Sequence, residues 1–265
     1  MAQRTRSGPA SEVTLVTATL SVSLLGIVME GGSAQVAASS LIGKVQLVSM
    51  LHTSAESAAE RVYAEVKERI LTNEIAGGEL ISEGEIASKC SVSRTPVREA
   101  FLRLETEGWM RLYPKRGALV VPIGDREKRD VVDARRLLEG HAVRSVTSRP
   151  AAVAELAERL RDNLAAHRRA DATDVAEFSR LDAAFHQLIA AAGDNPLLAD
   201  FYTTLGERHR RMTIASVHRD AGVAARILAD HLDLLGAIEA ADADRFEHLL
   251  AGHLAGVHDL PGEPA

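Results

Sequence analysis

Aromatic residues and cysteine are both scarce in this chain of 265 residues. Phenylalanine, tyrosine and tryptophan make up 3% of it, so the core must be built from leucine, valine, isoleucine and alanine. The one cysteine, Cys90, excludes an internal disulfide and is consistent with a reducing cytoplasm. It lies beside a predicted turn between two helices, where we expect a small core residue. No internal sequence repeat stands out.

The chain also lacks the excess of positive charge that is common in nucleic-acid-binding proteins. Its net charge is −6, which taken alone argues against DNA as a partner. The distribution of charge reverses that inference. Between Lys89 and Gly117 there are seven basic and three acidic residues, whereas from Ile123 to the end acids outnumber bases by 24 to 18. A small basic surface on an acidic body is typical of a protein whose DNA contacts are confined to one face.

Two short helices joined by a tight turn are predicted between Glu83 and Gly108. Ser82-Glu83-Gly84-Glu85 is typical of a capping box and opens the first helix. At the start of the second helix, Ser93 or Thr95 can accept a hydrogen bond from an amide of the first turn. Two helices joined in this way form a helix-turn-helix, in which the second helix enters the major groove of DNA.

Basic side chains gather on this second helix. Arg94 and Arg98 are four residues apart and therefore share one helix face. Arginine pairs bidentately with guanine edges and with phosphates, so these two are candidate base or phosphate contacts. The plain alternative for both is a solvated helix face.

A helix over 60–73 precedes the helix-turn-helix, and two strands over 109–113 and 118–121 follow it, joined by the turn Pro114-Lys115-Arg116-Gly117. Three helices and a hairpin with a basic tip form a winged helix. The residues predicted to contact DNA are Ser93, Arg94, Thr95, Arg98, Arg103, Lys115, Arg116 and Gly117.

These motifs resemble the DNA-binding domain of the GntR family of bacterial transcription regulators. The resemblance rests on Leu80-Ile81-Ser82-Glu83, on the stretch 93–100, on Leu104 to Trp109 and on Arg116-Gly117, which occur in the order typical of that family. It implies a double-stranded DNA operator and a homodimer that binds a short inverted repeat.

Residues 1–55 differ from the rest of the chain. Arg4 and Arg6 precede an apolar run from Val13 to Met29, and small residues follow it, as in a secretory signal. The run is marginal for a membrane span, and export would separate a DNA-binding protein from DNA. We expect a non-native or disordered extension, with Met50 as a sensible native start, no membrane association and a cytoplasmic location. A natural disordered tail and a real targeting segment are the alternatives.

No convincing strand signal occurs from Arg126 onward. Six amphipathic helices are predicted, with breaks at positions such as Arg149-Pro150 and Gly193-Asp194-Asn195-Pro196. Their approximate ranges are 126–148, 151–169, 173–192, 196–217, 221–241 and 243–258. The predicted fold class is therefore mostly α, with an N-terminal winged helix-turn-helix domain over 56–122 and an all-α bundle of six helices over 126–259.

Several polar residues fall inside the apolar stripes of these helices. Asp182 lies inside the stripe of its helix and His186 at its edge, one turn apart, while His231 and His253 lie within the stripes of two other helices. Buried polar groups are costly without partners, and a metal ion would satisfy all four together. Imidazole nitrogens with one carboxylate suit divalent ions such as zinc, nickel or manganese. The alternative for each is an ordinary core histidine with a hydrogen-bond partner.

The second half also resembles a known domain. Arg135-x-x-x-Glu139, Asp182-x-x-Phe185-His186, Gly193 to Leu197, and the pair His231 and His253 are similar to the FCD domain of the FadR branch of GntR regulators, in its shorter, VanR-type form. The resemblance implies that Asp182, His186, His231 and His253 bind a divalent metal beside a pocket for a small carboxylate.

Arg135 lies within an apolar stripe as well. It is a candidate for holding the carboxylate of a ligand bidentately; an ion pair with Glu139 or another acid is the alternative. His209 is off-centre on its helix and is a candidate only for the pocket wall.

The expected function is a ligand-responsive transcription regulator, with repression favoured. A small organic acid would complete the coordination of the metal, alter the relative placement of two DNA-binding domains and so change operator affinity. We do not expect an enzyme. The alternatives are a metal-dependent hydrolase, in which the ion activates water, and a sensor of the metal alone.

Overall fold

The computed structural model describes residues 57–171 and 173–260. The extension expected over residues 1–55 lies outside this range. Within the described part of the chain there are nine helices and three short strands, and the expected mostly α fold is confirmed. None of these helices has both the length and the apolar character of a membrane span.

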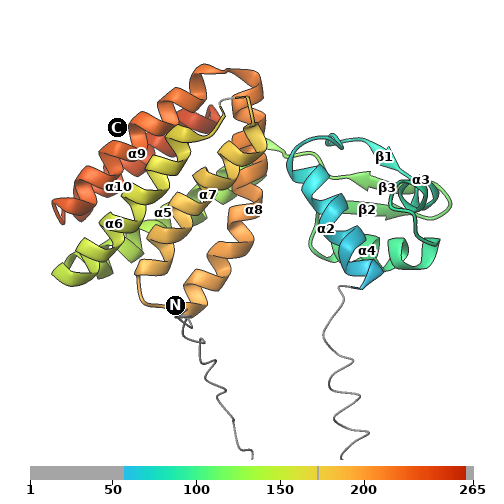
Figure 1. Ribbon diagram of the computed structural model, residues 1–265, viewed down its shortest axis with the longest axis horizontal. Helices are drawn as coiled ribbons and strands as arrows, with labels where there is room; N and C mark the ends of the chain where they lie inside the picture. The colour runs from blue at the N-terminus through green and yellow to red at the C-terminus, as the bar shows by residue number, and fades with distance from the viewer. Residues whose placement is uncertain (1–56, 172, 261–265) are drawn as a thin grey trace, which may run out of the picture. The chain divides into compact units, whose positions relative to one another are not determined.

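The winged helix consists of three helices and a small antiparallel sheet (Figure 1). The strands have the order β1-β3-β2, so the hairpin of β2 and β3 takes β1 along its free edge. The elements are α2 (Ala58–Leu71), β1 (Leu80–Ile81), α3 (Glu83–Lys89), α4 (Arg94–Thr106), β2 (Met110–Tyr113) and β3 (Gly117–Val120).

Side-chain caps explain where two of these helices begin. Ser57 and Glu60 form a reciprocal capping box, so α2 begins before the predicted position 60. The Ser82 side chain accepts a hydrogen bond from the Glu85 amide and opens α3 as predicted. The reading helix α4 differs from expectation: Ser93 is its N-cap residue, but the side chain makes no capping hydrogen bond. Ser93 itself is exposed.

The wing depends on a glycine. Gly117 begins β3 with φ +112°, a conformation that L-residues with a side chain rarely adopt. A β-carbon at this position would lie 2.3 Å from the carbonyl oxygen of Ile81. Gly117 therefore lets β3 pair closely with β1, and this pairing ties the wing to the start of the helix-turn-helix.

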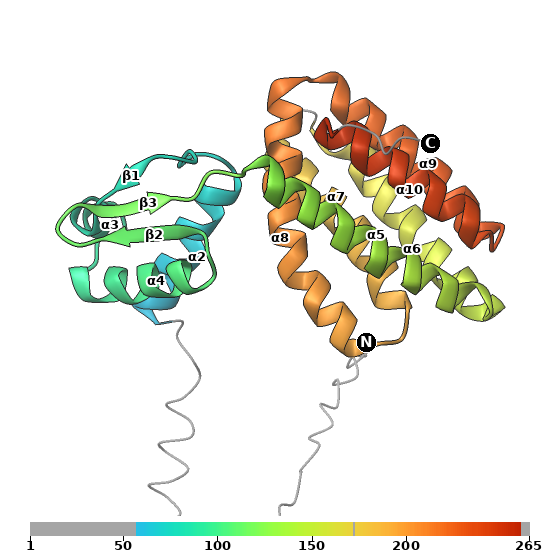
Figure 2. The ribbon, with the colours of Figure 1, turned by 180° about the vertical axis from the view of Figure 1, so that it is seen from behind.

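The helical domain consists of six helices, as predicted from the periodicity (Figure 2). Side chains of Asp174, Asn195 and Asp242 each accept a backbone amide hydrogen bond at a helix start. The helices are α5 (Asp125–Thr147), α6 (Pro150–Arg169), α7 (Val175–Ala192), α8 (Pro196–Arg219), α9 (Gly222–Glu239) and α10 (Ala243–His258).

The core of this domain is aliphatic, with few aromatic rings. Valine, leucine and isoleucine from α5, α6, α7, α9 and α10 surround Phe185 and Phe246, both of which are fully buried. Charged and polar side chains interrupt this core: Arg135, Glu139, Asp182 and five histidines on α6 to α10 are each at most 2% exposed, and His253 is 4% exposed. Buried polar groups on this scale need partners, and the partners define the candidate site.

Candidate functional site

The winged helix presents a groove between the reading helix α4 and the wing. Its volume is about 560 Å³, and five of the eight residues predicted to contact DNA line it: Arg94, Arg98, Lys115, Arg116 and Gly117. The four basic side chains among them are exposed. The fold therefore brings together charges that are about 20 residues apart in the sequence.

The other three predicted residues lie outside the groove. Ser93 and Thr95 are exposed at the start of α4. Arg103 forms an ion pair with Glu107 at 3.1 Å, and its guanidinium lies 3.7 Å from the centre of the Tyr63 ring. Arg103 is therefore already engaged by side chains of its own domain.

The four predicted metal ligands converge in the centre of the helical domain. Asp182 and His186 come from α7, His231 from α9 and His253 from α10, and one ligand atom from each lies within 4.8 Å of the others. All four are buried. The Nε2 atoms of His231 and His186 are 3.1 Å apart, and the His231 Nε2 lies 3.3 Å from Asp182 Oδ1.

These separations match the geometry of a metal centre. Two ligand atoms bound at about 2.1 Å and at angles of 90–109° lie roughly 3.0–3.4 Å apart. The wider 3.9 Å separation between His186 Nε2 and Asp182 Oδ1 corresponds to a larger angle. Asp182 Oδ1 is buried and has no hydrogen-bond partner among the described residues, so one anionic ligand atom is available. The set of three imidazoles and a carboxylate suits zinc, nickel or manganese.

Carboxylates orient two of the three histidines. His186 Nδ1 lies 2.7 Å from Glu139 Oε2, and His253 Nδ1 lies 3.0 Å from Asp230 Oδ2. Each Nδ1 must carry the proton in order to donate to a carboxylate, which leaves the lone pair of Nε2 for an ion. Such carboxylate–histidine pairs are typical supports of metal ligands.

The second oxygen of Asp182 is held by α8. Thr213 Oγ1 donates to Asp182 Oδ2 at 2.9 Å, and His209 Nε2 lies 2.9 Å from the same oxygen. Burial would raise the pKa of Asp182, but His209 and His231 hold it well below its ordinary value. The carboxylate is therefore ionised and ready to bind a cation at neutral pH.

Burial keeps two histidines of the centre, His186 and His231, neutral. It lowers the pKa of His231 to about 4, and it lowers the pKa of His186 well below the usual range, with the nearby charge of Arg135 acting in the same direction. The pKa of His209 is lowered for the same two reasons. Neutral imidazole is the form that binds metal, so few protons compete with an ion at neutral pH.

Arg135 lies on α5, next to this centre and completely buried. Its Nε donates to Glu139 and to the Tyr202 hydroxyl, which in turn donates to Glu139 at 2.5 Å. Burial disfavours the charged form, but Tyr202 and Glu139 hold the pKa of Arg135 above its ordinary value. Its two terminal nitrogens, Nη1 and Nη2, are buried and have no partner among the described residues.

The sequence patterns did not indicate Tyr202 and Thr213 as members of this network. They indicated His209 only as a candidate for the pocket wall. All three lie on α8 and are buried. Their spacings of seven and four residues place them on one helix face, a signal that they point the same way but not of which acid they contact.

Comparisons with known proteins follow the same division of the chain. A family described as "Bacterial regulatory proteins, gntR family" matches residues 58–120, and the FCD domain matches residues 130–256. The chain is similar to an HTH-type transcriptional regulator in an unstable DNA locus of Streptomyces ambofaciens, with 31% identity over 214 residues, which is 79% of this chain and 87% of that protein. It is also similar to the HTH-type transcriptional repressor RspR of Escherichia coli strain K12, with 30% identity over 199 residues, covering 74% and 85%.

Solved structures have the same fold. A GntR transcriptional regulator from Rhodococcus sp. RHA1 aligns with a TM-score of 0.61 and 21% identity, covering 77% of this chain and 97% of that one. McbR/YncC of E. coli aligns with a TM-score of 0.57 and 24% identity, covering 76% and 95%. At these identities the likeness concerns the fold alone.

Proposed function

Because the chain belongs to the GntR family of bacterial transcription regulators and carries the FCD domain, we propose that it is a repressor whose affinity for DNA depends on a divalent ion and a small organic acid in its helical domain. Relatives named as repressors support the sign of the regulation. Because the family consists of transcription regulators rather than enzymes, a hydrolase is not the function of this metal centre.

The DNA is bound by α4 and the wing. Arg94 and Arg98 lie in the groove between them, exposed and close to the basic tip formed by Lys115 and Arg116. In this arrangement α4 enters the major groove, and the wing contacts the adjacent backbone or minor groove.

This surface is tested with two variants and a control. Arg94→Ala and Arg98→Ala are each expected to weaken binding to a duplex selected by the wild-type protein by roughly 1–3 kcal/mol. Arg245→Ala, which removes an exposed arginine from α10, is expected to leave the affinity unchanged. Fluorescence anisotropy measures both. Wild-type affinity of the Arg94 and Arg98 variants contradicts the assignment.

The ion is held by Asp182, His186, His231 and His253. When bound, it supplies positive charge and open coordination positions for an oxygen ligand. The protein's own residues prepare the site: Glu139 and Asp230 fix the histidine rings, and Asp182 provides a negative charge in the core.

A small carboxylate is the effector that fits beside the ion. The observation that supports this most is Arg135, a buried cation whose two terminal nitrogens have no partner among the described residues and which shares Glu139 with the proposed metal ligand His186. A guanidinium with two free N–H groups binds a carboxylate bidentately. The same acid can then bind Arg135 and approach the ion with one of its oxygens.

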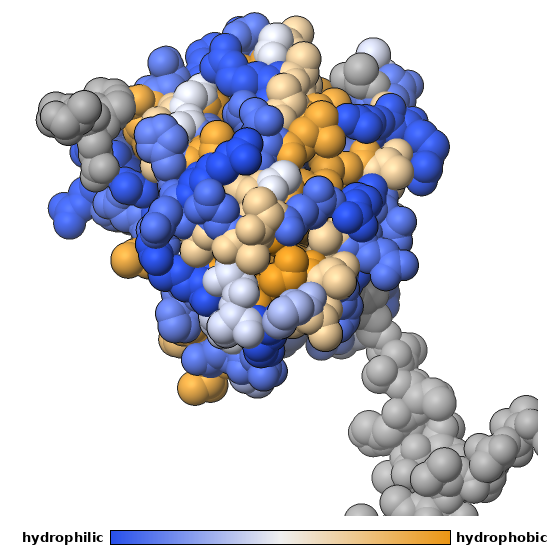
Figure 3. Space-filling view, turned by 90° about the vertical axis from the view of Figure 1, so that its left-hand side faces the viewer, coloured by the Kyte–Doolittle hydropathy of each residue, from blue (hydrophilic) through white to orange (hydrophobic). Residues whose placement is uncertain are grey.

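We propose a homodimer as the DNA-binding form, because an inverted-repeat operator has the twofold symmetry of a dimer. Three large apolar side chains of the helical domain are at least 70% exposed: Leu137 on α5, and Leu197 and Phe201 one turn apart on α8. Apolar side chains also gather on the face shown in Figure 3. Sedimentation equilibrium tests the dimer, and a monomer at micromolar concentration overturns it.

The effector is tested by binding to the metal-loaded protein. A panel of small mono-, di- and tricarboxylates is screened by thermal shift, and the acids that stabilise the protein are added to the DNA-binding assay. An active acid is expected to change DNA affinity, and Arg135→Lys, which keeps the charge but loses the bidentate geometry, is expected to abolish this change. The control is Arg129→Lys, which makes the same substitution at an exposed position of the same helix. If metal alone changes DNA affinity and no acid adds to it, the protein is a sensor of the metal.

A further inference from the structure

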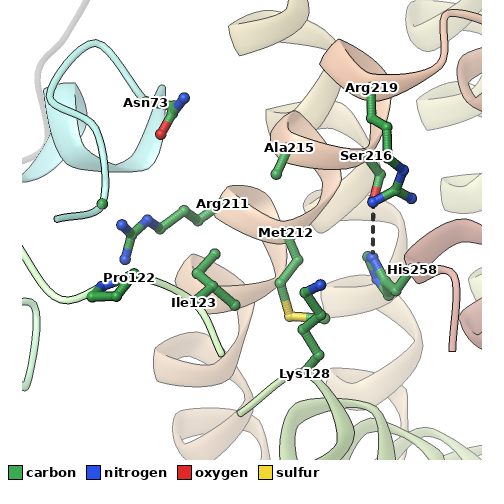
Figure 4. A pocket seen from close by; sticks show the side chains of 11 residues that line it. Asn73, Pro122, Ile123, Lys128, Arg211, Met212, Ala215, Ser216, Arg219 and His258 are labelled. Carbon is green, nitrogen blue, oxygen red and sulfur yellow. Dashed lines mark hydrogen bonds between the residues drawn. The ribbon is translucent and has the colours of Figure 1, made fainter. Parts of the chain in front are cut away.

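We infer that the protein binds a small oxyanion, of the phosphate or polycarboxylate class, at a second site formed by α5, α8 and α10 together with the turn after α2 and the segment before α5. The site is the pocket shown in Figure 4, which is lined by Lys128, Arg211, Arg219 and His258 together with Ser216. None of the four candidate metal ligands lines it, so it is distinct from the metal centre.

The charge of this pocket is one-sided. Lys128, Arg211 and Arg219 each contribute a positive charge, and no residue in the lining is an aspartate or a glutamate. This is unusual in a chain with a net charge of −6. Lys128 forms an ion pair with Asp125 at 3.2 Å. Arg211 and Arg219 have no ion-pair partner among the described residues, so an anion in the pocket would balance their charge.

Among the described residues no carboxylate lies within ion-pairing distance of Arg211, although this side chain is only 5% exposed. Its Nη1 donates to the backbone carbonyl of Val121. Burial lowers the pKa of Arg211 below its ordinary value, and Glu127, the acid that acts on it, is already paired with Arg208. A buried guanidinium in this situation is a strong donor for an oxyanion.

His258 provides a neutral donor in the same wall. It is 2% exposed, and its Nδ1 lies 3.5 Å from the Ser216 hydroxyl, as the dashed line in Figure 4 shows. If that hydroxyl donates to Nδ1, the proton of the ring is on Nε2. This Nε2 atom is buried and has no partner among the described residues, so a hydrogen bond to an oxyanion would satisfy it.

The size of the pocket limits the ligand. Its volume is about 230 Å³, which corresponds to about eight waters at roughly 30 Å³ each. That space holds a phosphate ion or a small di- or tricarboxylate with some water.

The pocket also lies next to the metal centre. The rings of His258 and His209 are in edge-to-face contact, with centroids 5.9 Å apart, and His209 contacts Asp182 at 2.9 Å. One histidine thus separates the anion site from the carboxylate ligand of the ion, and an anion bound at the pocket is placed to affect the metal centre through His209.

The experiment measures binding of inorganic phosphate, and separately of citrate, to the metal-loaded full chain by isothermal titration calorimetry at constant ionic strength. Saturable binding below about 10 mM is expected for at least one of the two. Arg219→Gln, at the exposed end of α8, and His258→Phe, which keeps a buried ring, are each expected to weaken that binding about tenfold. The control Arg245→Gln makes the same charge change on α10, outside the pocket, and is expected to have no effect.

A further variant separates the two sites. Asp182→Asn is expected to lose metal but to keep binding of the anion. Loss of anion binding in Asp182→Asn with retention in Arg219→Gln shows that the anion binds the metal, and it overturns the proposal while leaving the proposed function intact. The absence of saturable binding of both probes also overturns it.

Discussion

Glu139 connects the two halves of the candidate site, and its replacement by glutamine separates them. The carboxylate accepts hydrogen bonds from Arg135, from Tyr202 and from His186 Nδ1, and it is completely buried. Glu139→Gln keeps the shape of the side chain but removes its charge. Arg135 is then left as a buried cation without its hydrogen-bonded counter-ion, and His186 loses the charged acceptor that fixes its ring.

Two effects of known size are expected. Leaving one partner of a buried ion pair uncompensated costs about 3–5 kcal/mol of the free energy of unfolding. For a protein of this size each kcal/mol lowers Tm by about 2–4 °C, so the metal-free variant is expected to melt roughly 6–20 °C below the wild type. Loss of the carboxylate behind a metal-binding histidine weakens metal affinity about 10–100-fold.

Asp230→Asn is the matched comparison. Asp230 supports His253 as Glu139 supports His186, but its side chain is 31% exposed and no buried arginine depends on it. Its replacement is expected to weaken metal binding by a similar factor while changing the free energy of unfolding by at most about 1 kcal/mol. The two variants thus separate the effect of a carboxylate on metal affinity from its effect on the free energy of unfolding.

Competition with a chromophoric chelator measures the affinity for zinc, and calorimetry of the metal-free proteins measures Tm. The reasoning is refuted if both variants bind zinc within about threefold of the wild type, because neither histidine then acts as an oriented metal ligand. It is also refuted if Glu139→Gln melts at the wild-type temperature, because Arg135 then has another counter-ion.

Two further predictions concern the metal-free fold and the wing. The pKa of His231 is about 4 in the folded protein and about 6.5 when unfolded, so its contribution to stability, about 3 kcal/mol, is fully present above pH 6.5 and is lost between pH 6.5 and 4; a Tm of the metal-free protein that does not change between pH 7.5 and 4.5 contradicts this. Gly117→Ala places a β-carbon 2.3 Å from the Ile81 carbonyl oxygen at φ +112°. The variant is expected to lose roughly 1–3 kcal/mol of stability in the winged helix and to bind DNA more weakly, and wild-type values of both by calorimetry and anisotropy contradict the role of this glycine.

The helices could be predicted because strong local signals delimit them. Pro150 begins α6, and Gly193 and Pro196 stand at the boundary between α7 and α8, where a helix cannot continue without interruption. Between these breaks the apolar stripes are regular, so the inward position of Asp182 and His231 followed from helical geometry.

The elements that were missed have weak signals. β1 has two residues, too few to show an alternating pattern, and its pairing with β3 depends on contacts distant in sequence. The apolar spacing alone places the start of α2 at Glu60, whereas the capping box of Ser57 and Glu60 begins the helix at Ala58. In both cases only a few residues carry the signal, and one hydrogen-bond pattern determines the element.

The supporting residues of the site could not be derived from periodicity alone. Thr213 and Tyr202 are polar groups on a long helix, and nothing in the chain indicates that their hydroxyls meet an acid of another helix. Periodicity shows which side chains point inward, whereas the partner of each depends on how the helices pack. The alternatives for Arg135 illustrate this, because it pairs with Glu139 and also keeps two nitrogens unpaired.

The most direct test of the central claim is the metal content of three proteins purified in the presence of divalent ions. Elemental analysis is expected to find about one ion per chain in the wild type and in His248→Ala, whose exposed histidine lies on α10 outside the centre. His231→Ala is expected to lose the ion and to melt at a lower temperature, because metal binding contributes to folding. Less than a few tenths of an ion per wild-type chain, or an equal loss in both variants, would contradict the claim that these buried residues form a metal centre.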